Sequence, residues 1–205
     1  MTTLAQPRPV LAQPRLVAFI DRLATSPCCA AIVGEGSLNA ALASRVPIVF
    51  ILRGNGLELS AVVDRAHAAG KLVAAHLDLV DGIRADHRGV AWLARSGVDA
   101  IITSHGQLMQ AIRDEGAIAI QRLLLSRWSH LDTAITALSR SAPDIIEVLP
   151  GVILPSILKL MPEFDVPVLA GGFIRTIEDA RTVLGAGAIG VTTSSPVLWD
   201  WEAGL

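Results

Sequence analysis

Residues 168–193 read VLAGGFIRTIEDARTVLGAGAIGVTT, and this stretch decides the fold class of the chain. Two apolar runs, at 168–170 and 189–193, enclose a segment that predicts a helix over 180–184. Thr176 and Asp179 precede that helix at the spacing of an N-cap and its acidic partner, and glycines follow it. The stretch therefore predicts one strand, one crossover helix and the next parallel strand.

The same unit repeats along the whole chain. Eight short apolar runs alternate with polar or Gly-containing loops and helix-prone segments; the runs are 29–33, 48–52, 72–76, 100–103, 118–122, 145–149, 168–170 and 189–193. Uninterrupted apolar runs of this length are typical of parallel strands buried on both faces. They predict an α/β protein with a small TIM-type (β/α)8 barrel of parallel strands. An open doubly wound sheet is the alternative, but its only candidate dinucleotide motif, at 34–39, lacks the third glycine.

Length and composition limit the domain organisation. The 205 residues are close to the lower limit for a complete barrel. We expect a flexible N-terminal arm at 1–15, which is rich in Pro and Ala, and a single barrel domain at 16–205. The arm lacks the features of a secretion signal, and no apolar run is long enough to cross a bilayer. The adjacent Cys28 and Cys29 fit a buried strand rather than a disulfide framework, so we expect a cytoplasmic protein without membrane contact.

The loops after the seventh and eighth runs predict a phosphate-binding site. In (β/α)8 barrels these two loops, with the start of a short extra helix, often hold a phosphate at the C-terminal end of the strands. Glycines let backbone N–H groups approach an anion, and hydroxyl side chains add donors. Ser195 and Pro196 further predict a helix at 197–202 whose N-terminus points at the phosphate. The predicted phosphate ligands are Gly171, Gly172, Arg175, Thr192, Thr193 and Ser194.

A second polar group belongs to the third, fifth and sixth runs. His76 and Asp78 are two residues apart, so on a strand they point the same way and reach the barrel mouth. Glu147 interrupts an apolar run, and a buried carboxylate needs a partner, for which Arg122 on the neighbouring strand is the candidate. We expect these four residues to contact the non-phosphate part of the ligand. The alternative is structural: a satisfied internal His–Asp pair and an internal ion pair.

Familiar catalytic motifs are missing from the sequence. It contains no metal-ligand spacing, nucleophile elbow or P-loop. Its lysines, Lys71 and Lys159, lie at a strand start and in a helix, which disfavours Schiff-base chemistry. We therefore expect no cofactor, no metal and no enzymatic activity. The alternatives are a phosphate-binding isomerase or lyase that uses His76, Asp78 or Glu147, and a metabolite-binding module with a protein partner.

Six segments in this order and spacing carry a family resemblance. They are 71–82 (KLVAAHLDLVDG), 100–106 (AIITSHG), 119–123 (AIQRL), 146–151 (IEVLPG), 170–176 (AGGFIRT) and 190–194 (GVTTS). From about residue 26 to residue 199 the chain resembles the glycerol-3-phosphate-responsive antiterminators, which regulate bacterial glycerol uptake operons. The resemblance implies a small barrel that binds glycerol 3-phosphate, with the second polar group on the glycerol moiety. It also implies action on a leader mRNA, so that transcription continues past a terminator.

The charge of the chain limits how it can contact RNA. The net charge is −2 and no run of Lys or Arg is present, whereas nucleic-acid binders usually carry a basic face. An aromatic content of 4% also argues against a base-stacking platform. We therefore expect a local, arginine-based contact, and ordering of the loops 53–58 and 81–88 when the ligand binds. The candidate arginines around one edge of the barrel are Arg84, Arg88, Arg95 and Arg113.

The sequence leaves the oligomeric state open. A homo-oligomer is compatible with it, and so is a monomer.

Overall fold

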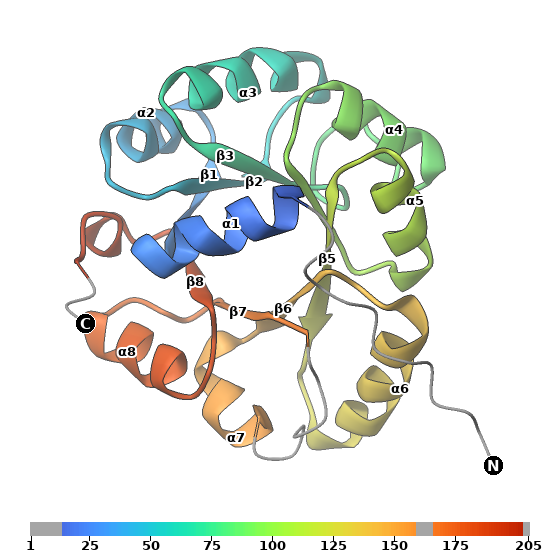
Figure 1. Ribbon diagram of the computed structural model, residues 1–205, viewed down its shortest axis with the longest axis vertical. Coiled ribbons are helices and arrows are strands. Elements are labelled where there is room, and N and C mark those ends of the chain that lie inside the picture. The colour runs from blue at the N-terminus through green and yellow to red at the C-terminus, as the bar shows by residue number, and fades with distance from the viewer. Residues whose placement is uncertain (1–13, 159–165, 203–205) are drawn as a thin grey trace.

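The eight apolar runs form the strands of a closed parallel barrel (Figure 1). The structure is a computed structural model that describes residues 14–158 and 166–202. Its strands are β1 (Cys28–Val33), β2 (Ile48–Arg53), β3 (Leu72–His76), β4 (Ala100–Thr103), β5 (Ile118–Leu124), β6 (Ile145–Leu149), β7 (Val168–Gly171) and β8 (Gly190–Thr193). Each strand pairs in parallel with the next, and β8 returns to pair with β1. The predicted TIM-type (β/α)8 barrel is therefore confirmed, and the open sheet is excluded.

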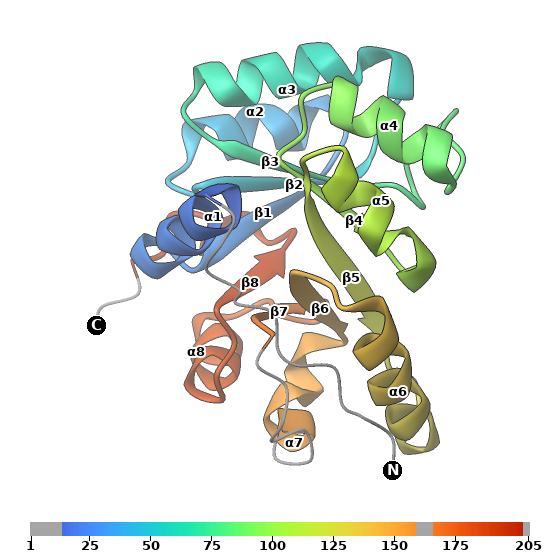
Figure 2. The ribbon, with the colours of Figure 1, turned by 45° about the vertical axis from the view of Figure 1, so that its right-hand side comes forward.

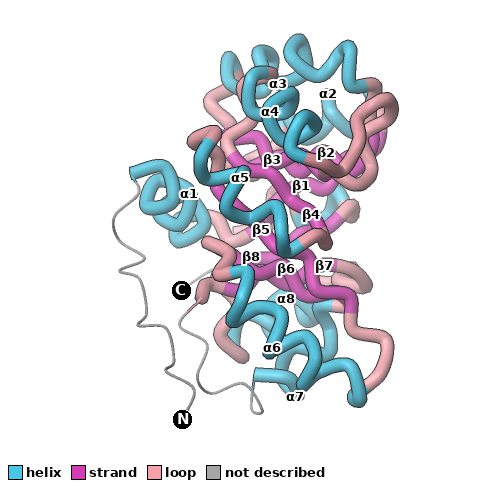
Figure 3. The backbone as a smooth tube through the Cα atoms, turned by 90° about the vertical axis from the view of Figure 1, so that its right-hand side faces the viewer, coloured by secondary structure: helices cyan, strands magenta, loops and turns pink. Residues whose placement is uncertain are grey.

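Apart from the first, which precedes β1, the helices surround the barrel and run back from the C-terminal to the N-terminal ends of the strands (Figures 2 and 3). They are α1 (Pro14–Thr25), α2 (Glu35–Ala43), α3 (Leu59–Ala68), α4 (His87–Arg95), α5 (Met109–Asp114), α6 (Leu131–Ser141), α7 (Leu154–Leu158) and α8 (Ile177–Gly185). The predicted capping box at the start of α8 is present, because Thr176 Oγ1 accepts from Asp179 N at 3.1 Å and Asp179 in turn accepts from Thr176 N. None of the helices in the described ranges is long and apolar enough to cross a membrane.

Alternation along the strands produces two hydrophobic cores. Side chains such as Ala30, Val49 and Ile101 pack outward against the helices, whereas their neighbours, such as Phe50 and Ile102, fill the barrel interior. This two-sided burial is the reason that the strands read as continuous apolar runs. Cys28 and Cys29 are free and buried in β1, as predicted, one on each side of the barrel wall.

Helix α1 closes the N-terminal opening of the barrel. It lies across that opening in Figure 1 and inserts Phe19, which is fully buried, into the interior core. Arg15 and Arg22 donate to the backbone carbonyls of Gly116 and Gly70 in loops at the same end. Residues 14 and 15, which we had assigned to the N-terminal arm, thus belong to α1, and the rest of that arm lies outside the described residues.

The expected helix at 197–202 is not present. The segment forms a single 3-10 turn, Pro196–Leu198, and Ser195 makes no side-chain capping bond. Trp199 explains the difference, because its ring is buried and its Nε1 donates to the carbonyl of Thr193 at 2.9 Å. This bond folds the chain back onto the end of β8, so no helix dipole is directed at the predicted phosphate site.

Candidate functional site

Four polar side chains form a layer inside the barrel, just below its C-terminal opening. Because side chains alternate along a strand, residues two positions after the interior Ala74, Ile120 and Ile145 also face inward. Those positions carry a His, an Arg and a Glu, and β8 contributes a Thr. The four residues of this polar layer are His76, Arg122, Glu147 and Thr192.

Glu147 is the centre of the polar layer. Arg122 Nε donates to Glu147 Oε2 at 3.0 Å, and Thr192 Oγ1 donates to Glu147 Oε1 at 2.8 Å. The Glu147 side chain is 2% exposed and that of Arg122 is 17% exposed. Both carboxylate oxygens therefore have a donor and the negative charge has a counter-ion, as a buried carboxylate requires. The predicted Arg122–Glu147 pair is confirmed.

Gly171 is required by this pair, whatever its backbone N–H contributes to the predicted phosphate site. A Cβ atom at Gly171 would lie 2.5 Å from Thr192 Oγ1 and 3.0 Å from Glu147 Oε1. Only a glycine leaves room for the Thr192–Glu147 hydrogen bond. Gly172 differs, since a Cβ there would make ordinary contact with Leu149 but the backbone φ is +74°. Its glycine is required by the left-handed backbone conformation.

The loops that follow β7 and β8 lie side by side. Thr193 Oγ1 donates to the carbonyl of Ile174 at 2.7 Å and joins the two loops. Several groups expected to bind phosphate are thus already used within the protein, because Thr192 and Thr193 donate to Glu147 and Ile174. Arg175 and Ser194 are exposed at this end of the barrel. Of the predicted phosphate ligands, they are the side chains best placed to reach a ligand from outside.

His76 is buried with no partner. Its side chain is fully enclosed, and within the described residues neither ring nitrogen makes a hydrogen bond. Burial and the nearby Arg122 lower the pKa of His76 to about 3, against the opposing effect of Asp78. The ring is therefore neutral at cellular pH, with one donor and one acceptor nitrogen. A hydroxyl group or a water molecule can serve either nitrogen, because it both donates and accepts.

Asp78 binds the neighbouring loop instead of His76. Its carboxylate accepts from Thr103 Oγ1, from Ser104 N at 2.8 Å and from Ser104 Oγ at 2.6 Å. Burial alone would raise the pKa of Asp78, but the hydrogen bonds from Ser104 and Thr103 outweigh it and hold the pKa below its usual value. The ionised carboxylate borders a cleft that Arg53 also lines. The direct His–Asp pair considered as an alternative is not formed.

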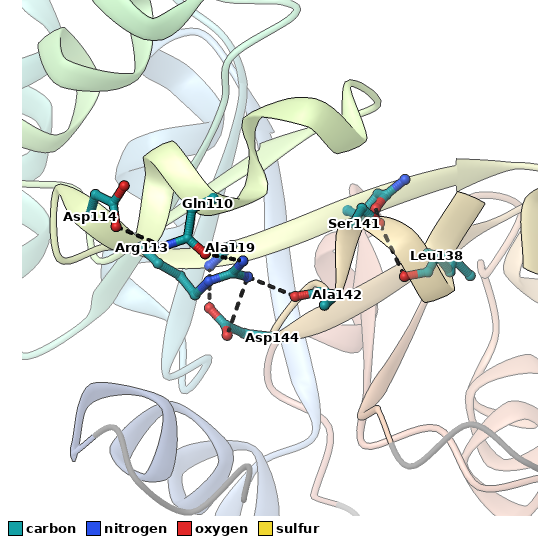
Figure 4. A network of polar contacts seen from close by, with 9 residues as sticks. Gln110, Arg113, Asp114, Ala119, Leu138, Ser141, Ala142 and Asp144 are labelled. Atoms are coloured by element: carbon teal, nitrogen blue, oxygen red, sulfur yellow. Dashed lines mark hydrogen bonds and ion pairs between the residues drawn. The ribbon is translucent and has the colours of Figure 1, made fainter. Parts of the chain in front are cut away.

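The arginines expected to form a basic edge do not lie together. Arg113 reaches from α5 to the start of β6, where it donates to the carbonyl of Ala142 at 2.7 Å and pairs with Asp144 at 3.9 Å (Figure 4). Its side chain is 10% exposed, so its charge serves the fold. Arg95 lies in the last turn of α4, at the N-terminal end of the strands. Only Arg84 and Arg88, before and in the first turn of α4, are exposed near the mouth.

In the described part of the chain, no three His, Cys, Asp or Glu side chains are grouped as a metal site would need. The polar layer is thus built from one ion pair, one hydroxyl and one neutral imidazole.

Comparison with known protein families gives a match over most of the chain. Residues 28–199 match the model of the family described as glycerol-3-phosphate responsive antiterminator. The chain is 30% identical over 183 residues to the uncharacterized protein YgcP of Escherichia coli (strain K12), covering 88% of this chain and 95% of YgcP.

Two solved structures are also similar. The glycerol uptake operon antiterminator regulatory protein of Listeria monocytogenes has a TM-score of 0.82 and 31% identity, over 86% of this chain and 96% of that one. A glycerol uptake operon antiterminator-related protein of Thermotoga maritima has a TM-score of 0.77 and 25% identity, over 85% and 98%.

Replacing Glu147 by Ala should destabilise the barrel. The change leaves the Arg122 guanidinium buried without its counter-ion, which typically costs about 3–5 kcal/mol. Denaturant titration measures the loss, and Glu115→Ala, an exposed glutamate after α5, serves as the control that should change little. An unaltered denaturation midpoint for Glu147→Ala would show that the pair contributes nothing to stability.

Protein stability should fall in acid because of His76. Between about pH 6.5 and about pH 3 the unfolded chain binds a proton that the folded imidazole does not, so the free energy of unfolding decreases as pH falls. The slope from this residue is at most roughly 1.4 kcal/mol per pH unit. A His76→Leu variant, compared with wild type by urea titration across this range, should lack that component. His130→Leu, an exposed control, should keep it; equal slopes for His76→Leu and wild type would refute a neutral buried ring.

Proposed function

Because the chain belongs to the family of glycerol-3-phosphate-responsive antiterminators, we propose that it senses glycerol 3-phosphate and regulates genes of glycerol metabolism by antitermination on a leader mRNA. The observation that carries this proposal is the extent of the family match. It runs from residue 28 to residue 199 and so includes every strand and every predicted ligand residue. Action on a transcript implies a cytoplasmic location.

The C-terminal end of the barrel offers different surroundings for the phosphate and for the glycerol moiety of the proposed ligand. The phosphate is assigned to the joined loops after β7 and β8, where Arg175 can supply a planar pair of donors and Gly172 adopts the left-handed conformation. The glycerol moiety is assigned to the polar layer and to Asp78. Its hydroxyl groups suit the neutral His76, whose two nitrogens need a partner that both donates and accepts.

The arrangement of these groups favours binding over turnover. Lys71 is buried at the N-terminal end of the barrel, where its Nζ donates to the carbonyls of Ser44 and Val46, each at 2.7 Å. Lys159 lies outside the described residues. Among the described residues His76 has no carboxylate partner, and Glu147 is held by an ion pair, so the acid–base groups that an isomerase or lyase would use are not poised for proton transfer.

Two further loops at the mouth are connected to each other. Asn55 and Asp81 form an isolated parallel bridge, with Gly56 N donating to the Asp81 carbonyl at 3.0 Å and Asp81 N to the Gly54 carbonyl at 2.9 Å. The loops 53–58 and 81–88, which we expect to respond to the ligand, would then move as one unit. Asp78 lies at the base of this unit, so a ligand that contacts Asp78 can act on both loops.

Glycerol 3-phosphate should bind at least about a hundredfold more tightly than glycerol. Two charge-assisted hydrogen bonds to the phosphate, at roughly 1.5–3 kcal/mol each, account for this ratio. Calorimetry with both compounds measures it, and equal affinity for both compounds would refute the phosphate assignment.

Replacing Gly172 by Val should abolish binding because a β-branched residue disfavours the left-handed backbone. Gly70→Val is the matched control and should leave binding unchanged, since Gly70 has the same φ of +74° at the opposite end of the barrel.

Glycerol 3-phosphate should increase the affinity for leader RNA without being consumed. A ligand shifts an equilibrium only by its different affinity for the two states, so the ligand-bound form must be the better RNA binder. NMR spectroscopy of the ligand over hours and an RNA gel shift with and without ligand measure the two parts. Turnover of the ligand would place the protein among the enzymes, and RNA affinity independent of ligand would exclude antitermination as its output.

A further inference from the structure

Exposed hydrophobic side chains gather at the C-terminal end of the barrel. In the described part of the chain, eight of the nine large exposed ones lie at the last residue of a strand, on the loops that follow the strands or at the start of α8; the ninth, Trp92, lies on α4. Concentration of exposed apolar groups on one face marks an interaction surface. The eight are Val33, Leu57, Leu124, Trp128, Val152, Phe173, Ile177 and Val197.

Five of these residues lie at or after the ends of β5, β6, β7 and β8, which are neighbours in the barrel, and we call this set the mouth strip; they are Leu124, Trp128, Val152, Phe173 and Val197. Hydrogen bonds hold the four strand ends together. Leu125 N donates to the Leu149 carbonyl at 2.8 Å, and Gly151 N donates to the Gly172 carbonyl at 3.2 Å. The Thr193–Ile174 bond joins the last two loops. The strand ends that carry the strip are therefore joined to one another.

Phe173 is held outward by an unusual backbone. Its φ is +61° and its side chain is 76% exposed. A bulky non-glycine residue in the left-handed region is strained, and strained residues of this kind cluster at functional sites. Burial of the ring does not offset this strain in the unbound protein, so contact with a partner is the stabilising interaction that the ring is placed to make.

Arginines accompany the two aromatic rings of the strip. Arg127 directly precedes Trp128, which is 62% exposed, and Arg175 is two residues after Phe173. Both arginines are exposed. Of the acidic groups on the same arc, Glu147 is buried in its ion pair and Asp179 accepts from Arg175 N and Thr176 N. Asp132 and Glu178 are exposed in the first turns of α6 and α8.

We propose that the mouth strip binds single-stranded RNA, with bases stacked on Trp128 and Phe173 and backbone phosphates on the adjacent arginines. The inference rests on the proposed function for the nature of the partner. Exposed rings flanked by guanidinium groups are the usual means of holding unpaired nucleotides. Although the chain is only 4% aromatic, two of its aromatic rings, those of Trp128 and Phe173, are exposed within the strip.

This position couples the two binding events directly. Phe173 lies between Gly172 and Arg175 in the loop assigned to the ligand phosphate, and Val197 follows Ser194 in the other loop. A phosphate that fixes these backbones also fixes the ring that stacks on RNA. Linkage then requires that RNA increases the affinity for glycerol 3-phosphate by the same factor by which the ligand increases the affinity for RNA.

The test uses the full chain and a single-stranded RNA that is enriched from a random pool on wild-type protein in the presence of glycerol 3-phosphate. Trp128→Ala, and Phe173→Asn, which tolerates the left-handed backbone, should each weaken RNA binding about tenfold or more in fluorescence anisotropy. Trp92→Ala removes an exposed tryptophan outside the strip and should bind RNA as the wild type does.

Arg127→Gln tests the phosphate contact and should reduce the slope of the logarithm of the RNA association constant against the logarithm of the salt concentration by about one. Trp128→Ala should still bind glycerol 3-phosphate in calorimetry, which also shows that it is folded.

The outcomes separate this inference from the proposed function. Wild-type RNA affinity in both strip variants overturns the assignment of the strip but leaves antitermination standing. A wild-type protein that binds no RNA with or without ligand contradicts antitermination itself. If the wild-type protein binds no RNA and Trp128→Ala converts a dimer to a monomer in sedimentation, the strip is a self-association surface and the RNA proposal is wrong.

Discussion

One buried carboxylate determines much of the geometry at the C-terminal end of this barrel. Glu147 lies on a strand that is otherwise apolar, so its charge must be neutralised inside the protein. Arg122 supplies the counter-ion and Thr192 the second donor. That arrangement excludes a side chain at Gly171. The backbone of Gly171 in turn excludes a side chain at Gly151, because a Cβ atom at Gly151 would lie 2.7 Å from the nitrogen of Gly171. Four strands are thus tied to one ion pair.

The architecture could be read from the sequence because burial on both faces is written into each strand. The pairing of Glu147 with Arg122 could also be predicted, since an ionised group in an apolar run needs a partner. Tertiary contacts that leave no local signal could not. Trp199 ends the expected C-terminal helix through a bond to the end of β8, and Arg113 is drawn into the fold by Asp144. The outward ring of Phe173 was missed because a positive φ at a bulky residue has no sequence signature.

The two ends of the barrel have different tasks. At the N-terminal end, helix α1 fills the opening, and Lys71 bonds to carbonyls before β2, so charged groups there are used for stability. At the C-terminal end lie exposed apolar side chains and an imidazole that makes no hydrogen bond to the described residues. Exposed apolar groups and a buried polar group without a hydrogen bond do not stabilise the fold, so their presence indicates a binding role. This separation is typical of (β/α)8 barrels, in which conserved function lies on the loops after the strands.

A sensor and an enzyme place different demands on the same barrel. An enzyme needs acid–base groups whose pKa values lie near the working pH, whereas His76 has a pKa of about 3 and the pKa of Asp78 is held low. Neither group changes charge around neutral pH, so the proposed contacts of these two residues with a neutral polyol would not vary with pH in that range. A signal that reports concentration benefits from this constancy. Because Phe173 belongs to the loop assigned to the phosphate, the response can be passed to a partner through a single loop, without a long path through the core.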